Sequence, residues 1–343
     1  MDFIWPLVGL VAVVWSVELL YKKLKAEAAV DPAVRALLEQ GGVWDNIRTI
    51  AGVIAAKIVA IPPHAYLLCA LSTLVAYAAL AWYDRIALIH LKRQKGISWF
   101  YIATCSFVTY ALSHNIGASV FSGGMVRYRA YTAKGLSAAE VAVLVALCSF
   151  TFAFGTILLL GLVLVGEPHI LRPLVSLSPW FAVNETAARL VGVAMLAFCL
   201  LYTIGSWLHF KPIAFGKLEI VYPRLPIVAR QYAAAPLELI GAAGIIYFAL
   251  PDGSPSFFIV LGAFLMSFSA GLLSQVPGGV GVMEAVFLAI MPTVPAPSVF
   301  AALLVWRLFY LILPLVFALP VVLLFERSQL ARAATPLEPR PPV

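Results

Sequence analysis

The chain has 343 residues, of which 63% are hydrophobic and only 11% are charged. Soluble domains carry roughly 25% charged residues, so this chain lacks the polar surface that keeps a folded globule in water. Its mean hydropathy of +0.98 predicts an integral membrane protein. The net charge of +7 does not indicate nucleic-acid binding, because the Lys and Arg residues stand in short patches between apolar segments.

No motif in the sequence predicts a metal, a cofactor or a catalytic residue. The sequence has no G-x-S-x-G and no H-E-x-x-H pattern, and His114 has no second metal ligand near it. Four widely spaced cysteines lie within apolar runs without C-x-x-C spacing, and we interpret them as packing residues (Cys69, Cys105, Cys148 and Cys199). We therefore expect no catalytic site, no metal and no cofactor.

Apolar segments in chain order predict the helices. The first, 3–21, is followed directly by lysines, the opposite of a cleaved signal peptide, so it predicts a helix that ends in the cytoplasm. A surface helix is expected over 26–45 and a short apolar limb over 47–61. Spans of about 20 residues suit a bilayer, and they are predicted at 64–83, 138–165, 187–210, 232–250 and 298–325. Ser137 and Glu140 form a capping-box pattern at the start of the second span.

Basic residues predict how these segments cross the membrane, because cytoplasmic loops collect Lys and Arg. Five patches hold 19 of the 23 Lys and Arg residues (22–48, 84–98, 127–134, 211–230 and 327–340). Residues 99–126 therefore begin and end in the cytoplasm, and residues 256–291 begin and end outside. Each segment is too long for one helix and too short for two spans. Both predict re-entrant hairpins that enter from opposite faces, with the N-terminus outside and the C-terminus in the cytoplasm.

The two hairpins match in sequence at a constant offset of 161 residues, which pairs Ser113 with Ser274 and Gly117 with Gly278. Opposed broken segments are typical of inverted-repeat transporters, whose site lies near the membrane midplane. We predict an all-α polytopic membrane protein with one domain over 1–330, repeat halves at about 99–210 and 232–326, and a disordered tail or linker over 331–343. The hairpins are expected to break at Gly117, Gly123, Gly124, Pro277, Gly278 and Gly279.

Ionisable residues within apolar segments are candidate functional residues, because charge is costly inside a membrane. Glu238 follows Pro236 within a span and is interpreted as a counter-ion, a proton carrier or a structural group. Glu284 and Arg307 are expected to pair across the second hairpin and the last helix.

Arg127 and Arg129 predict a lipid-phosphate site at the inner leaflet, because Arg forks bind phosphate in a bidentate manner. Ordinary cytoplasmic charge is the alternative interpretation of these two arginines. Asp84 and Arg85, at the end of a span, are interpreted as a pair of charged residues that anchors the helix at the inner membrane boundary.

The hairpins also resemble a known family. Residues 113–117 and 123–129 are similar to the first hairpin of the membrane region of the lysylphosphatidylglycerol synthetase/flippase family, the multiple peptide resistance factors. Residues 276–281 with Glu284 resemble the second signature of that family, and Tyr83–Asp84 resembles its inner-boundary pair. The resemblance covers most of residues 51–326.

The resemblance implies that the chain moves aminoacylated phosphatidylglycerol from the inner to the outer leaflet of the bacterial cytoplasmic membrane. In that family a cytoplasmic synthetase domain follows the membrane region. This chain is therefore expected to be either the membrane part of a longer protein or a stand-alone relative whose lipid substrate is open, with a cytoplasmic synthetase domain or protein as a possible partner. The resemblance assigns head-group handling to Asp84, Arg127, Glu238 and Glu284, and the predicted substrate site is completed by Asn115, Arg129, Gln275 and Arg307. An integral-membrane transferase of a lipid-linked substrate and a scaffold for a synthetase are the alternatives. The sequence leaves open whether the chain forms a homodimer.

Overall fold

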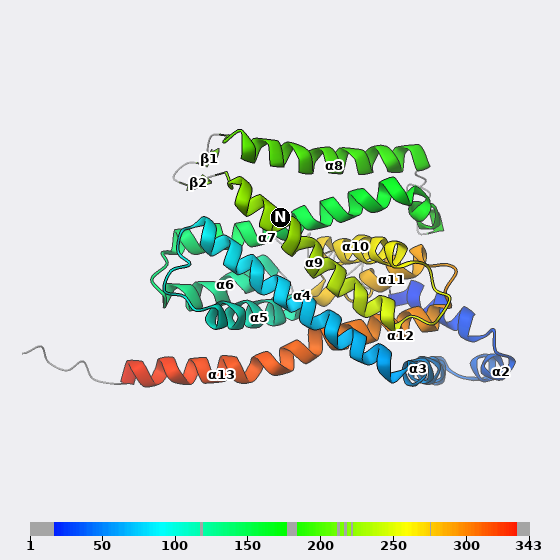
Figure 1. Cartoon of the computed structure of the whole chain (residues 1–343). Helices are drawn as coiled ribbons and strands as arrows, with labels where there is room; N and C mark the ends of the chain where they lie inside the picture. Colours follow the sequence, from blue (N-terminus) through cyan, green and yellow to red (C-terminus); the bar gives the residue numbers. More distant parts are fainter. Residues whose placement is uncertain are drawn as a thin grey trace, which may run out of the picture.

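The computed structural model describes residues 17–116, 119–176, 184–210, 213–215, 218–220, 222–274 and 276–334. Long helices run side by side along one axis and form a single bundle (Figure 1). Residues 17–28 are helical, and the remaining elements in chain order are α2 (Pro32–Gln40), α3 (Val43–Val59), α4 (Pro63–His90), α5 (Trp99–Ile116), α6 (Ser119–Thr132), α7 (Ala138–Gly166), η1 (Pro168–Ser176), α8 (Glu185–Trp207), β1 (Ile213–Phe215), β2 (Leu218–Ile220), α9 (Leu225–Ala249), α10 (Phe257–Leu273), η3 (Pro277–Gly279), α11 (Val282–Ile290), α12 (Ala296–Trp306), η4 (Arg307–Ile312) and α13 (Leu313–Ala334).

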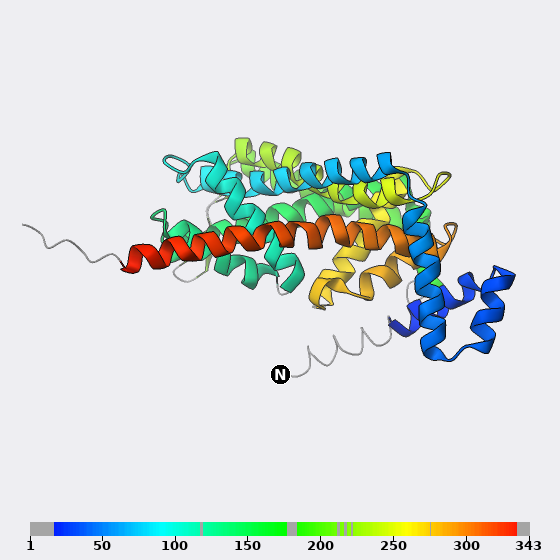
Figure 2. The ribbon, with the colours of Figure 1, turned by 90° about the horizontal axis from the view of Figure 1, so that it is seen from below.

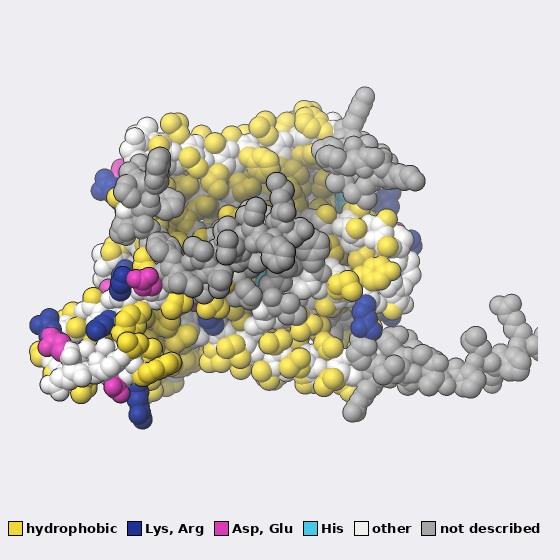
Figure 3. All heavy atoms as spheres, turned by 180° about the vertical axis from the view of Figure 1, so that it is seen from behind, with side chains coloured by type: hydrophobic (Ala, Val, Ile, Leu, Met, Phe, Trp, Pro, Cys, Tyr) yellow, Lys and Arg dark blue, Asp and Glu magenta, His cyan; other side chains and the backbone are white. Residues whose placement is uncertain are grey.

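Within the described part of the chain, five helical segments are long and apolar enough to cross a membrane: Pro63–His90, Ala138–Gly166, Glu185–Trp207, Leu225–Ala249 and Ala296–Phe325. They coincide with the five predicted spans, so the all-α polytopic membrane fold is confirmed. Figure 3 shows hydrophobic side chains over the middle of one face, with charged side chains gathered toward its two ends. The only strands among the described residues, β1 and β2, form a small antiparallel hairpin between α8 and α9.

Two short helical hairpins enter this bundle from opposite ends. One consists of α5 and α6, and the other consists of α10, η3 and α11. In Figures 1 and 2 their open ends point away from each other, while their tips face each other in the middle of the bundle. Residues of α5 contact η3, so the tips touch directly. The predicted re-entrant arrangement is therefore present.

The helices around the hairpins follow the predicted repeat. Each hairpin is preceded by one long helix and followed by another: α4 and α7 around the first, and α9 and α12 around the second. Adding the offset of 161 to the bounds of α4, 63 and 90, gives 224 and 251, and α9 covers 225–249. The correspondence therefore extends to helices that precede the two hairpins.

The first hairpin does not break where the glycine pair predicts. Gly123 and Gly124 lie within α6. The first limb ends at Ile116 and the second begins at Ser119, and Gly117 lies outside the described residues. Gly123 is needed for packing instead, because a Cβ there would lie 3.1 Å from Cγ2 of Thr109 on α5. The absence of side chains at Gly123 thus allows the two limbs to approach closely.

The second hairpin breaks as predicted. Pro277, Gly278 and Gly279 form the short turn η3 between the two limbs. Gly278 and Gly279 both have φ 61°, and Gly281 has φ 85°. These left-handed conformations are strained for residues with a Cβ, so glycine is required for the reversal.

The segment 22–48 lies at the opposite end of the bundle from the patches 84–98 and 127–134, so the prediction that these patches lie on the same side of the membrane is wrong (Figure 1). Lys23 donates a hydrogen bond to the carbonyl of Leu288, and the Glu27 carboxylate accepts one from the backbone of Ala296. Both partners lie near the loop between α11 and α12, far from the C-terminal ends of α4 and α6 (Figure 1). The charged side chains of Lys23 and Glu27 therefore bind backbone groups of α11 and α12. The predicted N-terminal orientation concerns residues 1–16, which lie outside the described residues.

The capping box that the sequence predicts at the start of α7 is confirmed. The Ser137 hydroxyl accepts a hydrogen bond from the Glu140 amide, and the Glu140 carboxylate accepts one from the Ser137 amide. Arg93, in the loop before α5, also donates to Glu140. This carboxylate raises the pKa of Arg93, because it stabilises the charged guanidinium.

Small residues allow α4 and α9 to cross closely at the centre of the bundle. A Cβ on Gly241 of α9 would lie 2.9 Å from the backbone nitrogen of Ala76 and from the backbone oxygen of Ser72 on α4. Close approach at small residues is the usual way in which membrane helices gain packing energy. The α4–α9 crossing thus depends on the missing side chain of Gly241.

We predict that Gly241→Ala destabilises the protein by about 1–3 kcal/mol, because the added methyl meets backbone atoms that cannot move aside. Gly52→Ala is the matched control, since a Cβ at this helical position meets nothing within 4 Å. Thermal unfolding in detergent measures both variants. A melting temperature of Gly241→Ala equal to or above that of Gly52→Ala would show that the crossing tolerates a side chain.

Candidate functional site

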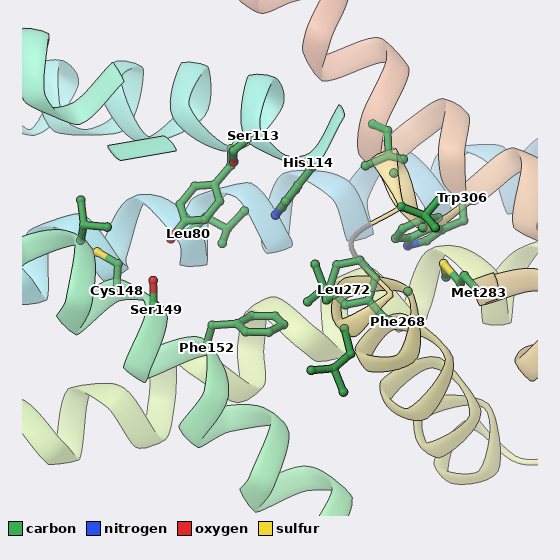
Figure 4. Close-up of a pocket in the computed structure, with 18 of the residues that line it drawn as sticks. Leu80, Ser113, His114, Cys148, Ser149, Phe152, Phe268, Leu272, Met283 and Trp306 are labelled. Carbon is green, nitrogen blue, oxygen red and sulfur yellow. The ribbon is translucent and has the colours of Figure 1, made fainter. Parts of the chain in front are cut away.

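A cavity of about 360 Å³ lies where the tips of the two hairpins meet. Its lining comes from α4 and α7, from both hairpins, and from the helix that follows the second hairpin (Figure 4). Most of the lining is apolar and aromatic, with polar side chains at four main positions (Ser113, His114, Arg127 and Ser149). A mostly apolar cavity with few polar groups is typical of ligand sites.

Arg127 is the cation of this cavity, and it is held by a buried carboxylate. Its Nε lies 3.2 Å from both carboxylate oxygens of Asp84, and its Nη2 lies 2.7 Å from Oδ1. The Tyr131 hydroxyl donates to Asp84 Oδ2 at 2.9 Å. Arg127 also lies 4.8 Å from the centroid of the Tyr110 ring, which favours a cation. Asp84 is 0% exposed and Arg127 is 4% exposed, so this ion pair joins α6 to α4 inside the protein.

Asp84 therefore does not form the anchor pair with Arg85 that the sequence suggests. Arg85 instead lies over the ring of Trp99, 5.8 Å from its centroid. The Asp84 carboxylate already accepts hydrogen bonds from Arg127 and Tyr131, and it is absent from the cavity lining. We interpret Asp84 as the residue that positions Arg127.

Arg127 and Arg129 lie on different sides of α6. Arg129 is exposed and belongs to a mainly apolar groove of about 340 Å³ between α5, α6 and α13. Two residues along an α-helix correspond to about 200° of rotation, so neighbours at this spacing face opposite ways. The structure does not bring these two arginines to one shared position.

Glu284 and Arg307 form the predicted pair, and the pair fixes the broken loop. Arg307 donates from Nε to Glu284 Oε1 at 2.6 Å and from Nη1 to the carbonyl of Gly278 at 2.8 Å. Glu284 Oε2 accepts a hydrogen bond from the backbone of Gly281 at 2.8 Å. Two backbone groups that the broken helix leaves without helical partners are thus satisfied by this ion pair. Their pairing is confirmed, and a role in substrate binding stays a prediction.

Glu238 is buried behind the cavity rather than in its lining. It is 1% exposed and accepts hydrogen bonds from the Tyr310 hydroxyl at 2.5 Å and the Tyr83 hydroxyl at 3.4 Å. It lies in the middle of α9, far from the helix N-terminus, so tyrosine hydroxyls rather than the helix dipole stabilise it. No cation forms an ion pair with Glu238 among the described residues.

An aromatic cluster that the sequence did not predict separates Glu238 from the cavity. The Tyr310 ring stacks on His114 at 5.4 Å and on Trp306 at 5.2 Å between centroids. Tyr310 lies in η4, a segment of π-helix that widens the last long helix, and such segments are frequent at functional sites. His114 Nδ1 and Trp306 Nε1 are buried without a hydrogen-bond partner among the described residues. Both side chains line the cavity, so a ligand there could satisfy them.

Two residues of the predicted substrate site remain, Asn115 and Gln275. Asn115 donates to the carbonyl of Ala111 at 2.8 Å and to that of Leu311 at 3.1 Å, which joins the tip of α5 to η4. Gln275 lies outside the described residues. No group of three or more His, Cys, Asp or Glu side chains that could hold a metal occurs in the described part of the chain.

We predict that Asp84→Asn destabilises the protein by about 3–5 kcal/mol, because it leaves a buried guanidinium without its counter-charge. The control is Glu185→Gln, which breaks the exposed pair with Arg172 and should cost under about 1 kcal/mol. Thermal unfolding in detergent compares the two. The double variant Asp84→Asn/Arg127→Gln should recover part of the loss, and equal stability of Asp84→Asn and Glu185→Gln would contradict the buried pair.

We predict that Glu284→Gln loosens the second hairpin tip, because the loss of a charge-assisted hydrogen bond of about 1.5–3 kcal/mol makes local opening at least about tenfold more frequent. Hydrogen–deuterium exchange of residues 276–283 measures this opening. Glu140→Gln is the control, since Glu140 accepts from a backbone amide in the same way at the distant start of α7. Unchanged exchange in Glu284→Gln would contradict the assigned role of the pair.

No family model matches the sequence. The chain is 30% identical over 249 residues to the uncharacterized protein slr0712 of Synechocystis sp., with 71% of this chain and 73% of that protein covered. It is 28% identical over 261 residues to the inner membrane protein YbhN of Escherichia coli, with 74% and 77% covered. The resemblance to the lysylphosphatidylglycerol synthetase/flippase family stays a prediction. At this identity and coverage, the chain, a polytopic membrane protein, belongs to the family of slr0712.

Proposed function

We propose that this protein moves a phospholipid across the membrane and that Arg127 in the central cavity binds the lipid phosphate. The observation that carries the proposal is the position of Arg127, buried in a cavity between the tips of two opposed hairpins. Arginine binds phosphate oxygens with directed hydrogen bonds, and broken segments near the midplane are typical of transporter sites.

Two apolar grooves beside α6 support a lipid rather than a small polar solute as the substrate. One, of about 340 Å³, lies between α5, α6 and α13 and includes Arg129. The other, of about 450 Å³, lies between α6 and α7. Apolar grooves next to a cationic cavity fit the two chemical parts of a phospholipid, its acyl chains and its phosphate.

The cavity chemistry favours recognition of the phosphate over recognition of an amino group. Arg127 and His114 are in the lining, and no carboxylate belongs to the described lining residues. Asp84 is engaged by Arg127, and Glu238 lies behind Tyr310. Lysylphosphatidylglycerol remains the substrate that the sequence resemblance favours. It carries the same phosphate as phosphatidylglycerol, so Arg127 would bind either lipid.

The proposed location is the bacterial cytoplasmic membrane, with the end that carries the patches 84–98, 127–134 and 211–230 in the cytoplasm. The name of the relative YbhN, an inner membrane protein, supports this location. The same end holds the C-terminal part of α13 (Figure 2). A synthetase that supplies aminoacylated lipid would act at that face.

The proposal predicts that the protein, reconstituted in liposomes, exchanges fluorescent phosphatidylglycerol between leaflets and that Arg127→Gln lowers the rate at least about tenfold, the effect of losing about 1.4 kcal/mol of binding. His114→Phe tests the cavity without disturbing the ion pair, because a phenyl ring keeps the aromatic packing and removes only polarity. We expect it to slow exchange as well. Arg172→Gln, at an exposed arginine, is the matched control and should leave the rate unchanged.

Separate liposomes, one set with labelled lysylphosphatidylglycerol and one with labelled phosphatidylcholine, show which head group the protein accepts. Faster exchange of the lysyl lipid would support the substrate that the resemblance favours, and equal exchange of both anionic and aminoacylated lipids would support recognition of phosphate alone. No exchange of any of these lipids by folded wild-type protein would contradict the proposal and favour a transferase or a scaffold.

A further inference from the structure

A groove on the membrane side of the bundle follows the seam between α6 and α7. It has a volume of about 450 Å³. Gly124, Met125 and Tyr128 line it from α6, and Ala142 and Ala146 are among its residues on α7. Met125 is 64% exposed and Tyr128 is 45% exposed, so the groove is open to the surroundings of the bundle. In a membrane these surroundings are lipid acyl chains.

The seam groove and the central cavity share one wall. Val145 and Ser149 of α7 line both the groove and the cavity. Figure 4 shows Ser149 beside Cys148 and Phe152 at the α7 wall of the cavity. Only side chains at this wall therefore separate the membrane-facing groove from the space that Arg127 lines.

The two sides of the seam carry small residues where they meet. A Cβ on Gly124 would come no closer than 4.0 Å to the Cγ2 atom of Val145. Ala138, Ala142 and Ala146 repeat at intervals of four residues along α7, so they lie on one face of that helix. Small residues leave this face without the interlocking side chains that close other helix contacts in the bundle.

The groove on the other side of α6 differs in this respect. It is lined from α5, α6 and α13 by residues such as Val108, Arg129 and Val322. None of its described lining residues belongs to the lining of the central cavity. Of the two apolar grooves beside α6, only the α6–α7 seam shares described lining residues with the cavity.

We propose that the α6–α7 seam is a lateral portal through which a membrane phospholipid enters the central cavity. The occupant is one lipid, with its acyl chains along Met125, Ala142 and Ala146 and its phosphate passing Ser149 to reach Arg127. Separation of α6 from α7 at Gly124 and Val145 opens the route. The inference rests on the proposed lipid transport and adds the path of entry.

A reversible crosslink across the seam tests the portal. The double variant Gly124→Cys/Val145→Cys places two thiols across the seam, where a Cβ on Gly124 would lie 4.0 Å from Cγ2 of Val145, and the four native cysteines are buried. In liposomes containing labelled phosphatidylglycerol, oxidation should lower leaflet exchange at least tenfold, and reduction should restore it. Each single cysteine variant should exchange lipid at the same rate before and after treatment with the same oxidant, whatever its own basal rate.

Side chains that fill one groove provide an independent test. Ala146→Trp fills the seam and should slow exchange at least tenfold, whereas Leu200→Trp, at a position on α8 that is 59% exposed and lines neither groove, should leave the rate within about twofold of wild type. Both positions lie on the membrane side of the bundle, so the pair controls for a bulky residue in lipid. Equal slowing by both variants would contradict a portal confined to the seam.

The outcomes separate the portal from the transport proposal. Lipid exchange by wild type that continues at the same rate in the crosslinked protein overturns the portal and leaves lipid transport standing. No exchange by wild type overturns both. A disulfide between two chains in the single variant Gly124→Cys, seen as a dimer without reductant, would show that a second copy covers the seam and would also overturn the portal.

Discussion

The architecture depends on one constraint: within a membrane, every buried charge and every interrupted helix must find its partners inside the protein. Two arginine–carboxylate pairs meet this requirement at the two hairpins. Arg127 on the first hairpin pairs with Asp84 on α4, and Arg307 after the second hairpin pairs with Glu284 and also binds the carbonyl of Gly278. Each pair joins a short re-entrant element to its surroundings, and together they allow two broken segments to meet at the centre of the bundle.

The sequence predicts the topology well because charge and length are properties of segments. The basic patches at 84–98 and 127–134 both predict a cytoplasmic position, so the segment between them had to enter and leave on the same side as a hairpin. The structure has α5 and α6 there. The same rule failed for 22–48, where Lys23 and Glu27 serve local contacts with residues near α11 and α12. A charge count does not distinguish such contacts from cytoplasmic exposure.

The site was less accessible to prediction, because partner choice depends on the packing of distant helices. Glu284 and Arg307 were paired correctly, whereas Asp84 was matched with its neighbour Arg85 instead of Arg127, 43 residues away. The opposite directions of Arg127 and Arg129 could have been inferred from helical periodicity. The stacking of His114, Tyr310 and Trp306 had no sequence signal, since it requires α5 and η4 to meet.

A phospholipid that binds Arg127 must enter the cavity between the hairpin tips. A photoreactive amino acid at His114, in the cavity lining, captures such a lipid in native membranes, and mass spectrometry identifies the adducts. We expect a phospholipid adduct at His114 that disappears when Arg127→Gln is added. An adduct at Leu200, which is 59% exposed on α8, together with none at His114 would show that lipid surrounds the protein without entering the cavity, the opposite of the proposed binding.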